Sequence, residues 1–347
     1  MAACAEVSVE YVAVEELAAY RASGWQDVLG IAAFAQESTL FDAGDVPVAR
    51  IGTRPLTGPS ALCEVWRAQG ELRSGVDGLV RYRTNGRLIL GMATLNEADV
   101  AAGADEGERL REATARIYQD IFRCVRSLGH ARVIRIWNYI PEITREIDGV
   151  ERYRHFNMAC QQAFQSCQQE VRGEVPAACA LGSPPGGSLV VYFLAGTGDV
   201  AAIENPRQMP AYDYPDDYGA YSPTFSRATV SGNPASPMLF ISGTASIVGH
   251  RTMYPGDVLA QTRESVANIR ALAGEANRAL GAPYFVPEQF QYKTYIRRSP
   301  DFEAIAAELR AAIHPSASIV FLHADICRTN LLVEIEAAGA TERRREH

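Results

Sequence analysis

The alternation of apolar and polar positions predicts two strands near the end of the sequence. Ser318–His323 and Leu331–Glu336 are apolar runs joined by a polar connection. Because side chains alternate along a strand, Glu334 and Glu336 share one face of the second run. Two carboxylates on an apolar strand indicate either a solvated sheet face or a functional site. For Glu336 the sequence favours a solvent-facing or structural role.

Other segments have the spacing of amphipathic helices. Apolar side chains recur at helical intervals over Ala113–Leu128, which is followed by Gly129. A longer stretch, Val258–Leu280, is followed by Gly281. Glycine directly after a periodic run is typical of a helix C-terminus. Strand-like runs flank both stretches, so the sequence predicts a mixed α and β chain.

The two halves repeat each other. Gly91 and Gly129 match Gly243 and Gly281 with one offset, and Tyr139 matches Tyr295 with an offset four residues larger. The repeat predicts an α+β fold of two duplicated lobes, each a mixed β-sheet with helices packed on one face. The predicted organisation has three parts: an N-terminal lobe (1–200), a linker (201–236) and a C-terminal lobe (237–347).

The linker contains an unusual segment, residues 205–227, with four tyrosines, four prolines and two arginines. Proline at this density excludes a regular helix or a central strand. The segment is either a connection between lobes or a loop that lays Tyr and Arg side chains over a pocket.

The repeat also bears on the carboxylate of the last strand. When Leu189–Tyr192 of the first half is aligned with Leu331–Glu334 of the second, Tyr192 is the counterpart of Glu334 in the repeat. A carboxylate in only one of two lobes is weak evidence for a specialised site.

Composition limits the partners. The net charge of -8 argues against a nucleic-acid or anionic-membrane partner, and the 47% hydrophobic content is that of a globular protein. Seven scattered cysteines without a Cys-x-x-Cys pair predict reduced thiols and a cytoplasmic location. The six histidines show no metal-binding spacing. The sequence shows neither a signal peptide nor an apolar run of about 18 residues.

Two segments of the C-terminal lobe carry a family resemblance. Phe240–Ala245 and Leu332–Ala337 are similar to the early Ser-Gly strand and the final Glu-Ile-Glu-Ala strand of the Rid/YjgF-like fold. With the Tyr/Pro/Arg-rich linker and the segment Cys327–Glu334, residues 80–340 resemble the chorismatases, which are enlarged relatives. Deaminases of this fold carry an arginine where this chain has Pro315–Ser318, so imine deamination is not expected.

The resemblance implies cleavage of chorismate to pyruvate and 3-hydroxybenzoate without a cofactor. Glu334 is the candidate acid that protonates the enolpyruvyl methylene carbon. Gly243 and Cys327 are typical of the type that forms 3-hydroxybenzoate. The resemblance thus makes Cys327 the second candidate catalytic residue, which shapes the pocket or assists the ring opening, with a thiol that only packs as the alternative. Two alternatives stay open: hydrolysis to a dihydroxycyclohexadiene carboxylate, and a non-catalytic metabolite-binding regulator.

Chorismate is a dianion, so a site for it needs cations and hydroxyl donors. Each candidate arginine has a surface role as its alternative. The predicted substrate-binding residues, besides Gly243, are Tyr153, Arg154, Arg207, Tyr212 and Arg297, with Arg298 as the alternative to Arg297. Simple relatives of this fold are trimers, which makes a homotrimer one expectation and use of the chain's own lobe interface the other.

Overall fold

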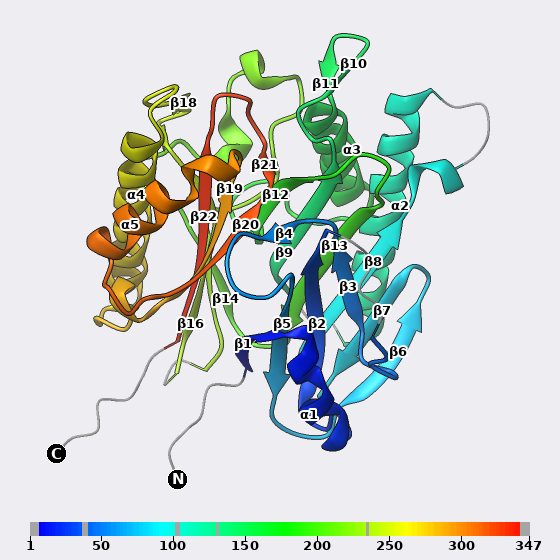
Figure 1. The fold of residues 1–347 in the computed structure, drawn as a ribbon. Helices are drawn as coiled ribbons and strands as arrows, with labels where there is room; N and C mark the ends of the chain where they lie inside the picture. Colours follow the sequence, from blue (N-terminus) through cyan, green and yellow to red (C-terminus); the bar gives the residue numbers. More distant parts are fainter. Residues whose placement is uncertain (1–6, 37–40, 101–104, 130–131, 234–235, 341–347) are drawn as a thin grey trace, which may run out of the picture.

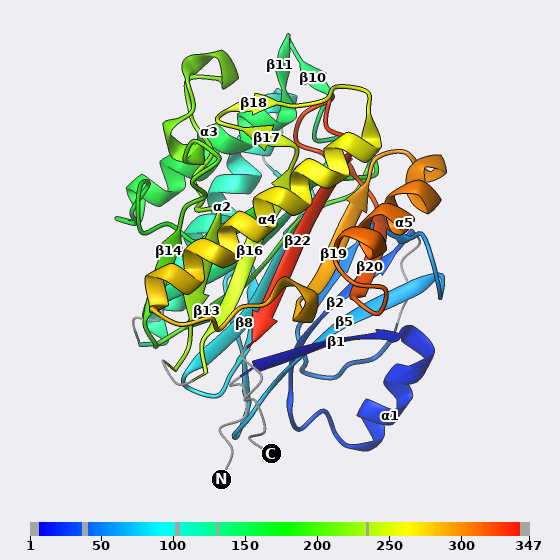
Figure 2. The ribbon, with the colours of Figure 1, turned by 90° about the vertical axis from the view of Figure 1, so that its left-hand side faces the viewer.

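Three β-sheets pack around a common centre, and the long helices lie on the outside (Figures 1 and 2). The computed structural model describes residues 7–36, 41–100, 105–129, 132–233 and 236–340.

The first seven-stranded sheet has the order β21-β12-β9-β13-β8-β7-β6. Its outer face is covered by α2 (Glu106–Ser127) and α3 (Arg152–Ser166). Its strands are β6 (Arg73–Asp77), β7 (Val80–Thr84), β8 (Leu88–Leu95), β9 (Arg132–Pro141), β12 (Ala177–Ser183), β13 (Leu189–Gly196) and β21 (Asp325–Ile326).

The second seven-stranded sheet has the order β14-β15-β16-β22-β19-β20-β4. Figure 2 shows α4 (Val258–Leu280) crossing this sheet diagonally, with α5 (Phe302–Ala312) beside it. Its strands are β4 (Arg54–Pro55), β14 (Val200–Ile203), β15 (Ala228–Ser231), β16 (Met238–Ala245), β19 (Gln291–Ile296), β20 (Ser318–His323) and β22 (Val333–Ala340).

The two sheets share one topology. In each, a parallel pair (β9 with β12, β19 with β20) lies beside an antiparallel strand (β13, β22) that leads to a meander. Each sheet also carries two helices on its outer face. The predicted α+β fold of two duplicated lobes is therefore confirmed.

Residues near the N-terminus form a third, smaller sheet. Its order is β1-β5-β2-β3, and α1 (Leu17–Ala22) packs against it. Its strands are β1 (Val7–Ala13), β2 (Val28–Ala35), β3 (Val48–Ile51) and β5 (Ala61–Ala68). The remaining short elements are β10 (Glu146–Ile147), β11 (Val150–Glu151), β17 (Ile247–Val248), β18 (Arg251–Thr252) and the 3₁₀ turns η1 (Val14–Glu16), η2 (Glu97–Asp99), η3 (Ala211–Asp213), η4 (Asp216–Tyr218), η5 (Pro287–Gln289) and η6 (Ser299–Asp301).

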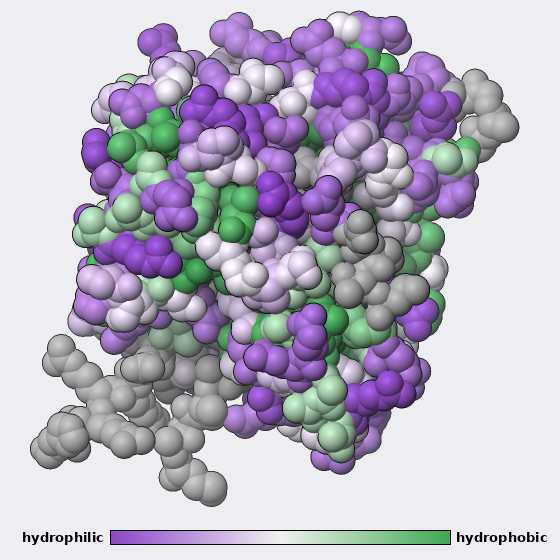
Figure 3. Space-filling model, viewed as in Figure 1, coloured by the Kyte–Doolittle hydropathy of each residue, from purple (hydrophilic) through white to green (hydrophobic). Residues whose placement is uncertain are grey.

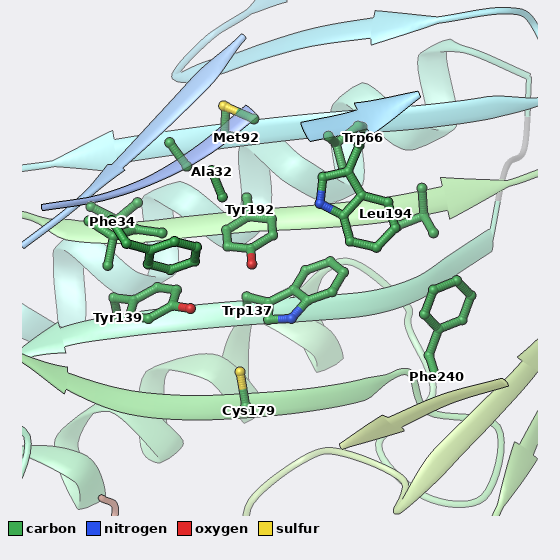
Figure 4. Packing of buried hydrophobic residues seen from close by; sticks show 14 of the residues in the cluster. Ala32, Phe34, Trp66, Met92, Trp137, Tyr139, Cys179, Tyr192, Leu194 and Phe240 are labelled. Carbon is green, nitrogen blue, oxygen red and sulfur yellow. The ribbon is translucent and has the colours of Figure 1, made fainter. Parts of the chain in front are cut away.

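The inner faces of all three sheets meet in an aromatic core. Trp66 comes from the N-terminal sheet, Trp137 and Tyr192 from the first lobe, and Phe240 from the second. Figure 4 shows Trp137 and Tyr192 lying together, and their rings stack with centroids 4.4 Å apart. Offset stacking of this kind adds to the stability that burial of the rings supplies.

Helix ends follow their capping residues. Asp105 accepts a hydrogen bond from the backbone N–H of Glu108, whose side chain bonds back, so α2 begins earlier than the predicted residue 113. The helix α4 has the predicted bounds and ends at Gly281, whose φ of 68° is costly for other residues.

The linker segment contains no regular helix or strand between residues 205 and 227, as its prolines predict; it holds only the turns η3 and η4. Two strands of the second sheet, β14 and β15, lie at its ends. The predicted division at residues 200 and 236 stays a proposal.

Strand register corrects the counterpart predicted for Glu334. Val190 of β13 pairs with Tyr139, as Glu334 of β22 pairs with Tyr295. Glu334 therefore matches Val190 rather than Tyr192. The first lobe still has no carboxylate at this position.

Hydrophilic residues dominate the upper part of the face shown in Figure 3. Among the described helices, none combines the length and apolar character needed to span a membrane.

Candidate active site

Glu334 lies near the start of β22, where the second lobe meets the first. It pairs with Ala245 of β16 on one side and Tyr295 of β19 on the other. Only 4% of the residue is exposed. Within the described part of the chain its carboxylate has neither a hydrogen bond nor an ion pair.

The surroundings of Glu334 favour its neutral form. Burial is the main cause and the negative charge of Glu336 the next, and together they raise the pKa of Glu334 to about 8. Arg135, Arg297 and Arg227 act in the opposite direction but do not cancel this effect. A carboxylic acid in such an environment can hold a proton at neutral pH and donate it.

Of the two roles that the sequence favours for Glu336, solvent-facing or structural, the structure shows the structural one. Glu336 is buried, its Oε1 lies 2.7 Å from Nζ of Lys293, and its Oε2 is ion-paired with Arg135. The indole N–H of Trp137 also donates to Oε2. Burial alone would raise the pKa of Glu336, but the two cations outweigh it and hold this pKa below its usual value.

The N-terminal sheet adds a fourth charged side chain, Glu64, to Glu336, Lys293 and Arg135. Oε2 of Glu64 on β5 lies 2.5 Å from Nζ of Lys293, and the hydroxyl of Tyr192 donates to Oε1 of Glu64. We call Glu64, Arg135, Lys293 and Glu336 the buried charge cluster. The sequence analysis selected no residue of the N-terminal sheet as a site residue, so this contribution was missed.

Gly243 makes room for the carboxyl group of Glu334. It lies where β16 bulges against β22, between Ile241 and Thr244. A Cβ atom at Gly243 would overlap Oε1 of Glu334 and lie 3.0 Å from Cβ of Cys179. Any larger residue here would therefore displace the carboxyl group.

Cys327 lies in the connection between β21 and β22. It contacts hydrophobic clusters of both lobes, and Arg297 fixes the surrounding backbone through the carbonyl oxygens of Ile326, Arg328 and Leu331. Burial, with the nearby Glu334 as the second cause, raises the pKa of Cys327 to about 12. The residue is thus a neutral thiol, unsuited to nucleophilic attack.

Tyr153 approaches the same place from the first lobe. Its ring packs on the hydrophobic cluster that Cys327 also contacts. Burial raises the pKa of Tyr153 well above its usual value, and Cys327 and Glu334 contribute in that order. The structure thus brings Glu334, Cys327, Gly243 and Tyr153 together at the lobe interface.

The predicted cations all have partners within the protein. Arg297 pairs with Asp325 at 2.6 Å, and Arg207 pairs with Glu264 at 2.5 Å. Arg154 is partly exposed and donates to the carbonyl oxygen of Asp217 in the linker. Arg298 pairs with Asp301 on the surface, and Tyr212 lies beside Glu204. Within the described part of the chain, neither is hydrogen-bonded or ion-paired to Glu334.

Two arginines that the sequence analysis did not select also act on the site, Arg227 on Glu334 and Arg328 on Cys327. Arg227 is buried between the rings of Tyr214 and Phe225, and its Nε has no hydrogen-bond partner within the described residues. Arg328 directly follows Cys327, and its guanidinium lies 4.1 Å from the ring centroid of Tyr218. The aromatic linker and the position next to Cys327 were the available signals.

The site combines the carboxylic acid of a buried residue, a partly buried thiol, a tyrosine and several guanidinium groups. Such a set can bind an anion and protonate it at carbon or oxygen. The described residues contain no group of three His, Cys, Asp or Glu side chains that could hold a metal ion.

Comparisons with known proteins agree with this arrangement. The sequence profile of the family described as "Chorismatase FkbO/Hyg5-like, N-terminal" matches residues 64–195. A 3-hydroxybenzoate synthase of Streptomyces hygroscopicus is 34% identical over 322 residues, covering 90% of this chain and 91% of that protein. A chorismatase of Streptomyces rapamycinicus is 32% identical over 345 residues, covering 96% and 99%.

A solved structure shares the whole architecture. A crystal structure of a chorismatase superposes with a TM-score of 0.85 at 30% identity, covering 97% of this chain and 99% of that chain.

Proposed function

This chain belongs to the chorismatase family, and on that basis we propose that it cleaves chorismate to pyruvate and 3-hydroxybenzoate. Family membership makes it a chorismate-converting enzyme. The observation that carries the finer proposal is the buried, unpaired Glu334 with a pKa of about 8.

Glu334 acts as the general acid. Its proton goes to the methylene carbon of the enolpyruvyl group, which becomes a methyl group on an oxocarbenium ion. The negative charge left on Glu334 is stabilised by Arg297, Arg227 and Arg135, the cations that act on its pKa. Protonation therefore turns the ether oxygen at ring carbon C3 into a leaving group.

The second half of the reaction decides the product. Attack of the C4 hydroxyl on C3 breaks the C3–O bond, releases pyruvate and returns a proton to Glu334. The arene oxide so formed opens, keeps its oxygen on C3 and loses the C3 hydrogen as a proton, giving 3-hydroxybenzoate. No water is consumed, which suits a carboxylic acid on a residue that is only 4% exposed.

The competing outcome is addition of water to the oxocarbenium carbon, which releases pyruvate and leaves the dihydroxycyclohexadiene carboxylate. Gly243 and Cys327 both border the Glu334 carboxyl group. The resemblance to the chorismatases associates these two residues with the type that forms 3-hydroxybenzoate, so they support that product. Tyr153, Arg154, Arg207, Tyr212 and Arg297 stay proposed substrate-binding residues, and Arg227 and Arg328 join them.

The test is pyruvate release from chorismate, followed by chromatography of the ring product. Wild-type protein should release one pyruvate for each 3-hydroxybenzoate, and Glu334→Gln should lose at least a thousandfold in kcat while still binding chorismate. Glu303→Gln, an exposed carboxylate on α5, serves as the control. Chorismate binding without pyruvate release by the wild type would indicate a metabolite-binding regulator instead.

A further inference from the structure

The buried charge cluster is balanced without Glu334. Glu64 and Glu336 supply two negative charges, and Arg135 and Lys293 supply two positive ones. All four side chains are buried, at 1 to 5% exposure. Glu334 is therefore a third carboxyl group beside a set of charges that already cancel.

We propose that Glu336 is a positioning residue that keeps Glu334 in its acid form by binding Lys293 and Arg135 and by presenting a fixed negative charge beside it. The inference rests on the proposed role of Glu334 as the general acid. It assigns a function to Glu336, which takes no part in the proposed proton transfer.

Strand geometry supports the proposal. Residues two apart on a strand share a face and lie about 7 Å from each other, so Glu336 is the nearest carboxylate on the face of Glu334. Lys293 is directly opposite Glu336 in the β19–β22 ladder. Glu334 is instead opposite Tyr295, whose hydroxyl donates to Glu336 rather than to Glu334.

Charged and titratable groups from every neighbouring element act on Glu334. The cations are Arg135 of β9, Arg297 after β19 and Arg227 before β15, and the anion is Glu336. Cys179 of β12, Cys327 and Tyr153 of α3 are neutral neighbours. Arg297 is paired with Asp325, and Arg135 with Glu336, so two of the three cations are already neutralised.

Removal of the Glu336 charge should favour the ionised form of Glu334 over its acid form. In Glu336→Gln, Arg135 and Lys293 face only Glu64, and the nearest group able to supply the missing negative charge is Glu334. Glu334 then ionises at lower pH and loses its proton before it meets the substrate. The enzyme should keep its fold but lose its acid at the alkaline end of the pH range.

The experiment is the pH profile of kcat/KM for chorismate. For Glu336→Gln, the alkaline limb should move to lower pH by more than one unit, so that the loss in kcat/KM is at least sevenfold greater at pH 8.5 than at pH 6. A merely structural role for Glu336 predicts the same fold-loss at every pH, and that result would overturn the proposal.

Two variants keep the test valid if Glu336→Gln does not fold. The double variant Glu336→Gln, Lys293→Met removes one anion and one cation, and it should move the limb at least halfway back toward the wild type. Glu336→Asp keeps the charge and should hold the limb within half a pH unit of the wild type. A double variant whose alkaline limb lies more than one pH unit below that of the wild type would contradict the charge balance, whether or not Glu336→Gln folds.

A substrate-free titration separates the two proposals. The carboxyl infrared band of Glu334, obtained as the difference between wild type and Glu334→Gln, should persist to about pH 8. In a Glu336→Gln background it should disappear at lower pH. If the band shifts but chorismate is not cleaved, the proposed function fails and the inference stands; if chorismate is cleaved but the band does not shift, the inference fails alone.

Discussion

Glu334 and Glu336 face the same side of β22, yet their carboxylates have opposite surroundings. Glu336 has two cations and two aromatic donors, whereas Glu334 has burial without a partner among the described residues. Two carboxyl groups whose environments drive their pKa values apart take different roles, one as a fixed charge and one as a proton donor.

The pKa of Glu334 predicts a pH-dependent stability. Its folded-state pKa of about 8 lies above the ordinary value of 4.5, so the folded protein holds a proton that the unfolded chain releases between these limits. Stability therefore falls as pH rises through this window. Glu334→Gln should raise Tm relative to wild type at pH 9 by several degrees more than at pH 5. An equal change in Tm at both pH values would contradict burial of an uncompensated carboxyl group.

Gly243 predicts a change in product. In Gly243→Ala combined with Cys327→Ala, the new methyl group moves the Glu334 carboxyl and the lost thiol opens space. We expect at least a tenfold lower kcat and a larger share of the dihydroxycyclohexadiene carboxylate by chromatography. Gly274→Ala is the matched control, because a Cβ there meets no atom within 4 Å and α4 should gain about 0.5–1 kcal/mol. An unchanged product ratio would contradict the proposal that Gly243 and Cys327 select 3-hydroxybenzoate as the product.

At the scale of residues, the sequence singled out Glu334, whose catalytic role stays a proposal, and predicted a solvent-facing or structural role for Glu336, of which the structure shows the structural one. The alternation of β22 placed both on one face correctly. The partners of Glu336 lie on β9 and β19, roughly 200 and 40 positions away in the sequence, and no local pattern can show such pairs.

At the scale of elements, the structure of β21 links the lobes. This strand leaves the second lobe and pairs with β12 of the first, with Gly182 opposite Asp325. The connection that carries Cys327 begins where this pairing ends. The geometry of the site therefore depends on a two-residue strand contact between lobes.

Gly182→Ala tests this contact. A Cβ at Gly182 would lie 2.5 Å from Cβ of Asp325 and 2.8 Å from Cγ2 of Ile143, so the strands must separate. Overpacking of this kind costs about 1–3 kcal/mol, which denaturant titration would measure, and pyruvate release should fall as Cys327 moves. Gly198→Ala, whose Cβ meets nothing within 4 Å, is the control. Equal stability of the two variants would show that the β12–β21 contact does not contribute to the stability of the fold.

Elements were predicted well where a local signal marks them, as with the glycine that ends α4. The register between strands was not predicted well, because bulges shift the pairing of residues at Ile241/Thr244 of β16 and at Leu194/Ala195 of β13. A bulge adds a residue without changing the apolar pattern enough to be seen. The alignment of Glu334 with Tyr192 matched two four-residue apolar runs and was two residues out of the strand register.

At the scale of the whole molecule, the N-terminal sheet completes the core between the two lobes. The duplication predicted two lobes, and the structure confirms them, but no repeat marks the third sheet. Its Glu64 bonds to Lys293 of the second lobe and to Tyr192 of the first. All three sheets should therefore unfold together.

Glu64→Gln tests that cooperativity. The substitution leaves Lys293 with a single buried anion, and breaking a buried pair costs about 3–5 kcal/mol. Because Glu64 contacts both lobes, the loss should lower one shared unfolding transition, with calorimetric and van't Hoff enthalpies in agreement. Glu71→Gln is the control: its carboxylate is exposed and 3.9 Å from Arg73, so the change should stay within about 0.5 kcal/mol. Two separate transitions in either protein, or equal stability of both variants, would show that the lobes do not share the charge cluster as a common support.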